Sequence, residues 1–139
     1  MPIDTSKKLL SYSVGLHNVG SYQVSGIPYI TGSSALSPGD ENKLEFPMVA
    51  RNITVVNHST GSLRVHFNAK DSGDVYGGFH YIELDSDEDS ISMSVKCREI
   101  YVSCPAGLGG VDREYRVIAE LTQIGVNRMY ALTGSGLTD

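Results

Sequence analysis

Apolar and polar residues alternate with a period of two along much of the chain. The clearest stretches are Leu63–Phe67, Ile91–Val95 and Tyr115–Leu121, in which every second side chain is apolar. This period is typical of β-strands with one buried face, whereas an amphipathic helix would repeat every 3.6 residues. The pattern therefore predicts an almost entirely β-stranded protein with less than about a tenth of its residues in helices.

Turn sequences rich in Gly, Pro, Asn and Ser separate the strand-like stretches, as at Ser37–Asp40 and Asn57–Gly61. Eight or nine strands are predicted, the first of them interrupted at Gly26 and Pro28. Their ranges are 22–31, 43–46, 49–57, 63–67, 79–84, 91–95, 99–103 and 114–124. Short strands at this spacing favour an all-β, antiparallel β-sandwich, and their number favours a jelly-roll-like arrangement. An immunoglobulin-like sandwich is the alternative, although the chain has no Trp for the Cys–Trp–Cys pattern.

The same alternation predicts which side chains meet between the two sheets. The expected core includes Val65, Phe67, Met93, Val95, Val117 and Ala119. At 139 residues, without a repeat or a long linker, residues 1–139 are expected to form one domain. We expect that domain to carry an extended N-terminal arm, about 1–20, and a short C-terminal tail.

Composition and charge narrow the range of partners. The formal net charge is −5, and the eleven Lys and Arg residues are scattered, so no nucleic-acid partner is expected. The N-terminal residues show no secretory signal pattern, and no stretch has the length of an apolar membrane span. No membrane partner is expected, and the protein is expected in a cytosol-like compartment.

Cys97 and Cys104 flank one predicted strand. An extended strand would hold them roughly 20 Å apart, whereas a disulfide requires Cα atoms within about 7 Å. We therefore expect two free, packed thiols.

Residues that could carry catalysis or hold a metal do not form a recognisable motif. The four His residues (His17, His58, His66 and His80) are far apart in sequence, and the strand pattern places His66 on a solvated face. His66 and His80 could meet across neighbouring strands, but the cluster of His and Glu that would complete a metal site is missing. Asp85–Ser90 resembles the start of a calcium loop but lacks the Gly and Glu that the loop requires. We expect an exposed turn there, and no catalytic residue, metal or cofactor.

Three internal stretches and the end of the chain together resemble small virion proteins. The stretches are 21–33, 45–57, 63–67 and 130–138. They are similar to single jelly-roll decoration (cement) or minor capsid proteins of tailed bacteriophages and large icosahedral viruses. The resemblance implies a non-enzymatic structural protein of the virion, made in the host cytoplasm. It also implies a symmetric homo-oligomer, often a trimer, that sits on the major capsid protein.

A ligand-binding function is the alternative, because eight Tyr residues could provide stacking surfaces for a carbohydrate. Tyr is equally favoured in strands and at subunit interfaces. The alternative is therefore a carbohydrate- or ligand-binding β-sandwich module.

Apolar residues near both ends of the chain have no obvious place in the strand pairing. They are Leu9, Leu10, Tyr12, Met129, Tyr130 and Leu132. We expect these side chains to contact a neighbouring subunit or the capsid. A terminal strand that packs back onto its own sandwich is the alternative.

Overall fold

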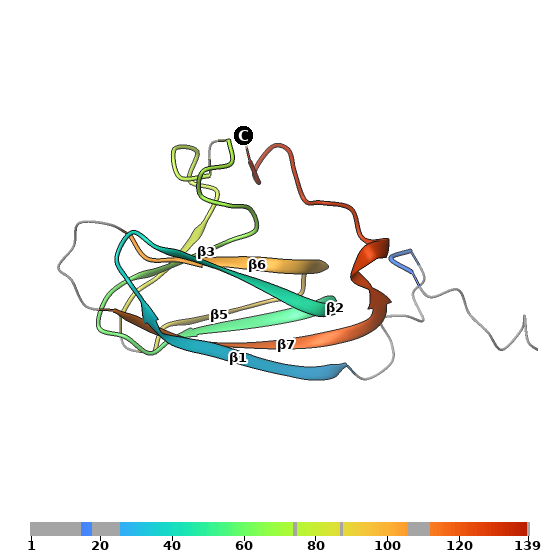
Figure 1. Ribbon diagram of the computed structural model, residues 1–139, viewed down its shortest axis with the longest axis horizontal. Helices are drawn as coiled ribbons and strands as arrows, with labels where there is room; N and C mark the ends of the chain where they lie inside the picture. The colour runs from blue at the N-terminus through green and yellow to red at the C-terminus, as the bar shows by residue number, and fades with distance from the viewer. Residues whose placement is uncertain (1–14, 18–25, 74, 87, 106–111, 139) are drawn as a thin grey trace, which may run out of the picture.

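The computed structural model describes residues 15–17, 26–73, 75–86, 88–105 and 112–138. Within these ranges it is an antiparallel β structure with one short 3-10 turn, η1 (Val126–Arg128) (Figure 1). The strands are β1 (Ile27–Leu36), β2 (Glu41–Asn57), β3 (Leu63–His66), β4 (Ile82–Leu84), β5 (Ser90–Met93), β6 (Cys97–Ser103) and β7 (Arg113–Gly125). The all-β prediction is confirmed, with seven strands in the described part of the chain against the eight or nine expected.

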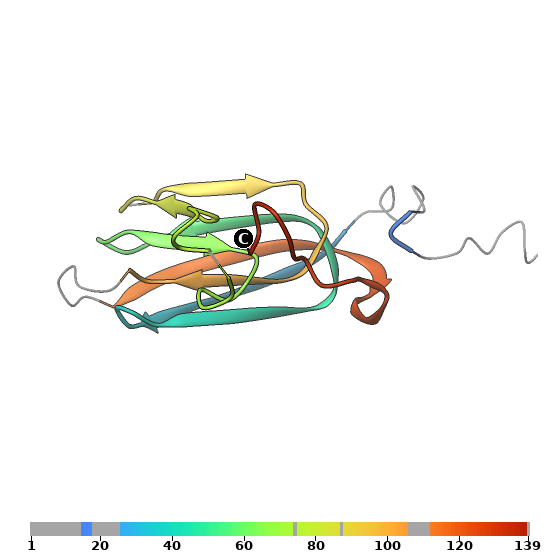
Figure 2. The ribbon, with the colours of Figure 1, turned by 90° about the horizontal axis from the view of Figure 1, so that it is seen from above.

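The strands form one sheet that folds over on itself. Its order is β1-β7-β2-β6-β3-β4, and β5 pairs with β2 outside this path. Residues 41–45 of β2 pair with β6, while residues 52–57 pair with β7. β2 therefore runs out along one layer, turns, and returns in the other (Figures 1 and 2). We call β1-β7-β2-β5 the lower layer and β2-β6-β3-β4 the upper layer.

The turn in β2 lies around Pro47. The register of β2 shifts between Glu45 and Ala50 against β6, and again between Met48 and Asn52 against β7. Such bulges bend a strand. Pro has no backbone N–H to donate to the regular hydrogen-bond ladder of a sheet, so within strands it is found at bulges and edges. The sequence suggested two strands separated by Pro47, and the structure joins them into one bent strand.

The inner faces of the two layers form the core. Of the six predicted core residues, Val65, Val117 and Ala119 are buried. The other three are partly buried and pack against the same cluster: Phe67, Met93 and Val95. The prediction is therefore confirmed at the centre of the sandwich, while the other three positions keep part of their surface exposed.

Both cysteines are free and buried, as expected. Burial raises the pKa of the Cys97 thiol to about 12 and also raises that of Cys104. Because the thiolate is the reactive form, these side chains act as small apolar groups of the core.

The acidic segment forms the expected exposed turn. Asp85, Ser86, Glu88 and Asp89 are all exposed. The backbone N–H of Asp85 donates to the Asp89 carboxylate at 2.9 Å, which closes the turn. The expectation that this turn binds no calcium remains a prediction.

Asn57, at the end of β2, is a fully buried polar residue that connects three segments. Its Nδ2 donates to the carbonyls of Gly61 (2.8 Å), Leu84 (3.3 Å) and Asp85 (2.8 Å). Its Oδ1 accepts from the backbone N–H and the hydroxyl of Ser59, at 3.0 and 2.5 Å. One side-chain amide thus provides hydrogen-bond partners for backbone groups of the β2–β3 turn and for those at the end of β4.

We predict that Asn57→Ala lowers the free energy of unfolding by about 3 kcal/mol, because it leaves several buried polar groups without partners. Asn52→Ala is the matched control in the same strand: its amide donates to Ser94 Oγ at the surface, 3.1 Å away. Its loss should cost less than about 1 kcal/mol. Urea unfolding of the two variants measures the difference, and equal losses would contradict the role given to Asn57.

Candidate functional site

The predicted terminal interface residues lie in different environments. Leu9, Leu10 and Tyr12 fall outside the described residues. Tyr130 presents its side chain to solvent, with 63% of its surface exposed. Leu132 is partly buried and packs against the core of its own chain, so most of its side-chain surface is not available to a neighbouring subunit.

Met129 is 4% exposed and packs in a small cluster with Leu16, Val49 and Ile124. The cluster closes the end of the sandwich beside the turn of β2. At Leu16 and Met129 the structure thus agrees with the alternative in which the terminal segments pack on their own sandwich. Tyr130 remains a predicted interface residue.

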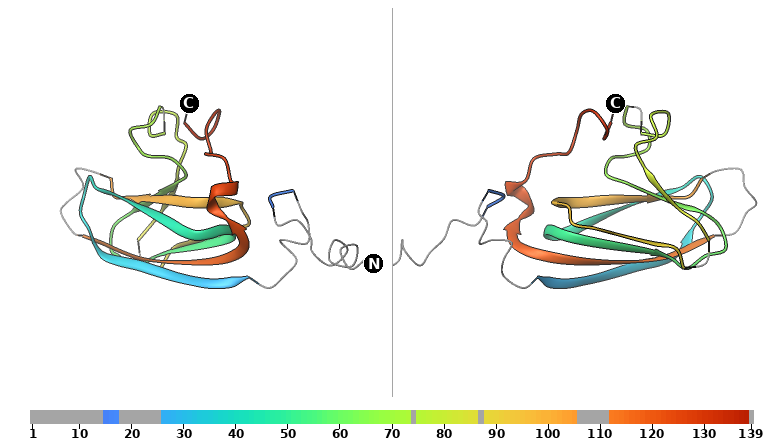
Figure 3. Two further views of the ribbon diagram at one scale, coloured as in Figure 1. Left: turned by 45° about the vertical axis from the view of Figure 1, so that its right-hand side comes forward. Right: turned by 180° about the vertical axis from the view of Figure 1, so that it is seen from behind.

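His66 differs from its expected position on a solvated face, because its side chain is 1% exposed. It lies on the outer face of β3, and the segment 67–81 rises over this side of the upper layer (Figures 1 and 3). The His66 ring stacks on the Tyr101 ring, with centroids 5.9 Å apart, and contacts the Tyr76 ring edge-on, with centroids 5.8 Å apart. The alternation in the sequence correctly placed the His66 side chain on the face of β3 that points away from the core. It did not indicate that another segment covers this face.

The hydrogen bonds around His66 assign its tautomer. Nδ1 lies 2.5 Å from the backbone carbonyl of Asn68, which can only accept, so Nδ1 carries the proton. Nε2 then accepts from the Ser103 hydroxyl at 2.9 Å. The Tyr76 hydroxyl in turn donates to Ser103. This relay connects the segment 67–81 to β6.

A serine beside a histidine is also the arrangement of a nucleophile and its base. Ser103 is fully buried, and its oxygen is already bonded to both Tyr76 and His66. His66 Nδ1 donates to the backbone carbonyl of Asn68, whereas in a catalytic triad the histidine donates to a carboxylate. We therefore interpret the relay as a clasp that holds segment 67–81 on the upper layer.

No group of three or more His, Cys, Asp or Glu side chains that could hold a metal is brought together within the described ranges. His66 is occupied by the relay. Across the same ranges, no helix has the length and apolar character needed to span a membrane.

Phe79 and its neighbours form an exposed aromatic patch beside the clasp. The Arg64 guanidinium lies over the rings of Tyr76 (4.7 Å) and Tyr81 (4.4 Å). Phe79 contacts Tyr81 with ring centroids 6.3 Å apart and is itself 77% exposed. We call Phe79 and Tyr81, whose rings contact each other, the loop patch.

The backbone of Phe79 is strained, with φ of 61°. A bulky residue in this left-handed region costs about 1 kcal/mol or more, and such strain concentrates at binding sites. The turn is held by hydrogen bonds from Phe79 N–H to the Tyr76 carbonyl (3.2 Å) and from His80 N–H to the Val75 carbonyl (2.7 Å). The fold thus projects a large apolar ring into solvent at a cost in stability.

A second apolar patch lies on the outer face of the lower layer. Ile30 on β1 is paired directly with Ile118 on β7, and they are 67% and 43% exposed. Ile27, at the start of β1, is 50% exposed, but it is paired with the buried Leu121 and therefore lies on the inner face with Tyr29. We call Ile30 and Ile118 the sheet patch. The sequence contained the signal for it, because apolar residues fall in two successive positions of one strand, Tyr29 facing inward and Ile30 outward.

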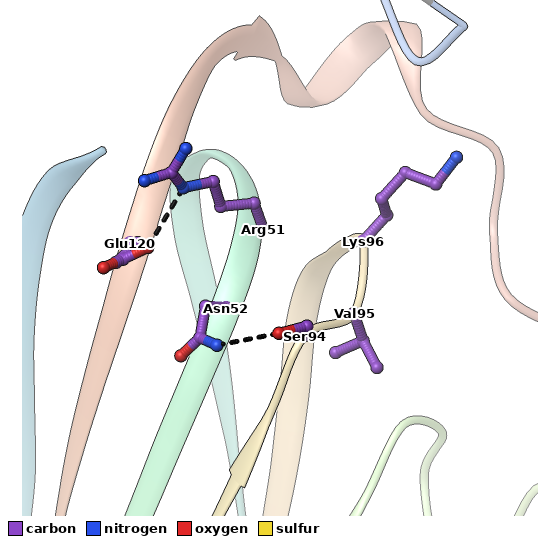
Figure 4. A pocket seen from close by; sticks show the side chains of 6 residues that line it. All are labelled: Arg51, Asn52, Ser94, Val95, Lys96 and Glu120. Carbon is purple, nitrogen blue, oxygen red and sulfur yellow. Dashed lines mark hydrogen bonds and ion pairs between the residues drawn. The ribbon is translucent and has the colours of Figure 1, made fainter. Parts of the chain in front are cut away.

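An open hollow of about 490 Å³ lies where the turn of β2 approaches the end of β5 (Figure 4). Its lining residues are Arg51, Asn52, Ser94, Val95, Lys96 and Glu120. Arg51 pairs with Glu120 at 3.0 Å, and Asn52 donates to Ser94. None of the described lining residues has an aromatic ring on which a sugar could stack, so the loop patch suits a carbohydrate better than this hollow.

Comparisons with protein-family models, curated proteins and solved structures found no match to the chain.

His66 generates a prediction on pH. Burial is the main cause that lowers its pKa below the ordinary 6.5, although the Asn68 carbonyl and Glu41 act in the opposite direction. The unfolded chain therefore binds more protons than the native one below pH 6.5, and stability is lost as the pH falls. We expect His66 to contribute a loss of stability of up to about 1 kcal/mol between pH 7 and 5.5.

Urea unfolding at these two pH values measures the loss. In His66→Gln the loss should be smaller by about that amount, because the titrating group is gone. An unchanged pH dependence in His66→Gln would show that the buried ring does not control stability in this range.

Proposed function

We propose that the protein is a non-enzymatic structural protein of a virion. In this proposal it forms a homo-oligomer and decorates or cements an icosahedral capsid by binding the major capsid protein. The resemblance of residues 21–33, 45–57, 63–67 and 130–138 to small virion proteins supports the virion as the location.

The observation that carries the proposal is the pair of apolar patches on the two layers. Ile30 and Ile118 are exposed on the lower layer, whereas Phe79 is exposed beside the upper one. Exposed apolar groups gathered on a small domain mark surfaces that associate with other proteins. A protein that must contact both its own copies and a second protein needs two such surfaces.

We assign the loop patch to the capsid. The Phe79 ring is held in place by a strained turn, by Tyr81 and by the clasp, so little conformational freedom is lost when a partner covers it. A rigid aromatic side chain that enters a pocket of the partner is the usual centre of a protein–protein interface.

The test is fractionation of particles on a density gradient. We predict that the full-length protein migrates with assembled capsids and that Phe79→Asn reduces the bound fraction about tenfold or more. Asn accepts a positive φ readily, so this variant should fold at least as stably as the original. His58→Asn, on the exposed β2–β3 turn, serves as the control and should bind normally. A protein that never migrates with capsids would contradict the proposal.

A carbohydrate-binding module is the second candidate, favoured by the rings of Tyr81 and the exposed Phe79, since sugars stack on aromatic faces. A glycan array tests it directly. Binding to a defined glycan that Phe79→Asn abolishes, in a protein that does not associate with capsids, would favour this candidate over the first.

A further inference from the structure

We propose that β1 pairs with β1 of a second copy, antiparallel and about a two-fold axis at Ile30. The lower layers of the two copies would then join into one continuous sheet. The proposal rests on the self-association included in the proposed function, and it replaces the trimer implied by the resemblance with a two-fold dimer.

β1 is a long strand whose outer edge has no partner among the described residues. Among the described strands it pairs with β7 alone, and it lies at the margin of the lower layer in both views of Figure 3. Its ten residues, Ile27–Leu36, include no charged side chain. The edge strand β4 at the other end of the sheet has only three residues and includes Glu83.

Soluble proteins usually protect an exposed edge with charges, bulges or short strands, because its free backbone groups pair readily with another chain. β1 has one bulge, between Ser33 and Leu36, and Pro28 near its start. The stretch between them is regular and uncharged. An uncharged strand can face a copy of itself without repulsion, which favours a second copy as the occupant.

The side chains select one register. Directly paired residues point to the same face of a sheet, so Ile30 must oppose an outward-facing residue of the partner. If Ile30 opposes its own copy, the pairing of Ile30 with Ile118 extends across the axis. Four isoleucines then form one continuous row, in which each covers part of its neighbour's exposed surface.

The charges beside this row are complementary in the same register. Gly32 is paired with Arg116, and Pro28 is paired with Glu120. The two-fold axis aligns the Gly32–Arg116 row of one copy with the Pro28–Glu120 row of the other. Each Arg116 therefore lies in the same row as Glu120 of the other copy, three strand spacings away, once on either side of the isoleucines. Within its own chain Arg116 pairs with Glu114, and Glu120 pairs with Arg51.

Gly32 makes room for the Arg116 side chain. A Cβ at this position would lie 2.8 Å from Arg116 Cδ and 3.1 Å from Nη1, so the arginine side chain lies against Gly32 of β1, while its guanidinium donates to the Tyr115 carbonyl and pairs with Glu114. A hollow of about 380 Å³ surrounds it, lined by Ile30, Gly32, Ser34 and Arg116 among others. A shift of two residues would instead place Arg116 in the row of the partner's isoleucines and interrupt that row.

The first experiment uses sedimentation velocity of the full-length protein across a range of concentrations. We expect a dimer whose dissociation constant rises about tenfold or more in Ile30→Lys, because the substitution sets two like charges opposite each other. Ile82→Lys is the matched control: it replaces an exposed isoleucine on β4 and should leave the dimer intact. A monomeric original protein, or equal effects of the two variants, would overturn the proposal.

The second experiment tests the register. Antiparallel partners directly opposite each other have Cα atoms about 4.5–5.5 Å apart, which is within the range of a disulfide. Ile30→Cys should therefore form a covalent dimer on mild oxidation. Ile118→Cys should not, because three strand spacings, roughly 14 Å, separate the two copies. Cross-linking through Ile118→Cys but not Ile30→Cys would refute this register.

Capsid binding separates this inference from the proposed function. A dimer that dissociates in Ile30→Lys supports the β1 contact even if no capsid is bound. Conversely, capsid binding by a protein whose association does not depend on Ile30 would support the function and overturn the β1 dimer.

Discussion

The bent strand β2 is the constraint on which the rest of the fold depends. Residues 41–45 hold β6 in the upper layer, and residues 52–57 hold β7 and β5 in the lower one. Because one covalent strand serves both layers, it fixes how their inner faces meet. It also explains the number of strands: in the described part of the chain, seven strands give each layer four because β2 belongs to both layers.

The polar interior depends on this arrangement. Asn57 ends β2 and satisfies the backbone of two turns, while the His66 clasp fastens segment 67–81 onto β6. Buried polar groups stabilise a fold only when each finds a partner, and both networks meet this requirement through contacts distant in sequence. The clasp in turn positions the strained turn of Phe79, so a buried network determines the geometry of an exposed apolar ring.

The two patches divide the surface into regions with different physical character. The loop patch depends on a rigid, strained turn and is suited to insert one ring into a partner. The sheet patch lies along β1, where, in the proposed dimer, backbone hydrogen bonds would contribute most of the association and side chains would select the register. In the proposed function, a chain that carries both patches would connect copies of itself and attach them to a capsid.

The sequence by itself determined the fold class, the core positions Val65, Val117 and Ala119, the free cysteines and the exposed acidic turn. These follow from local pattern, because alternation and turn chemistry act over a few residues. The tertiary structure decided the continuity of β2 through Pro47, the burial of His66 and Met129, and the edge position of β1 among the described strands. Each of these features depends on contacts with segments distant in sequence. Alternation with a period of two specifies only the face of the strand to which a side chain points, not whether another segment covers that face.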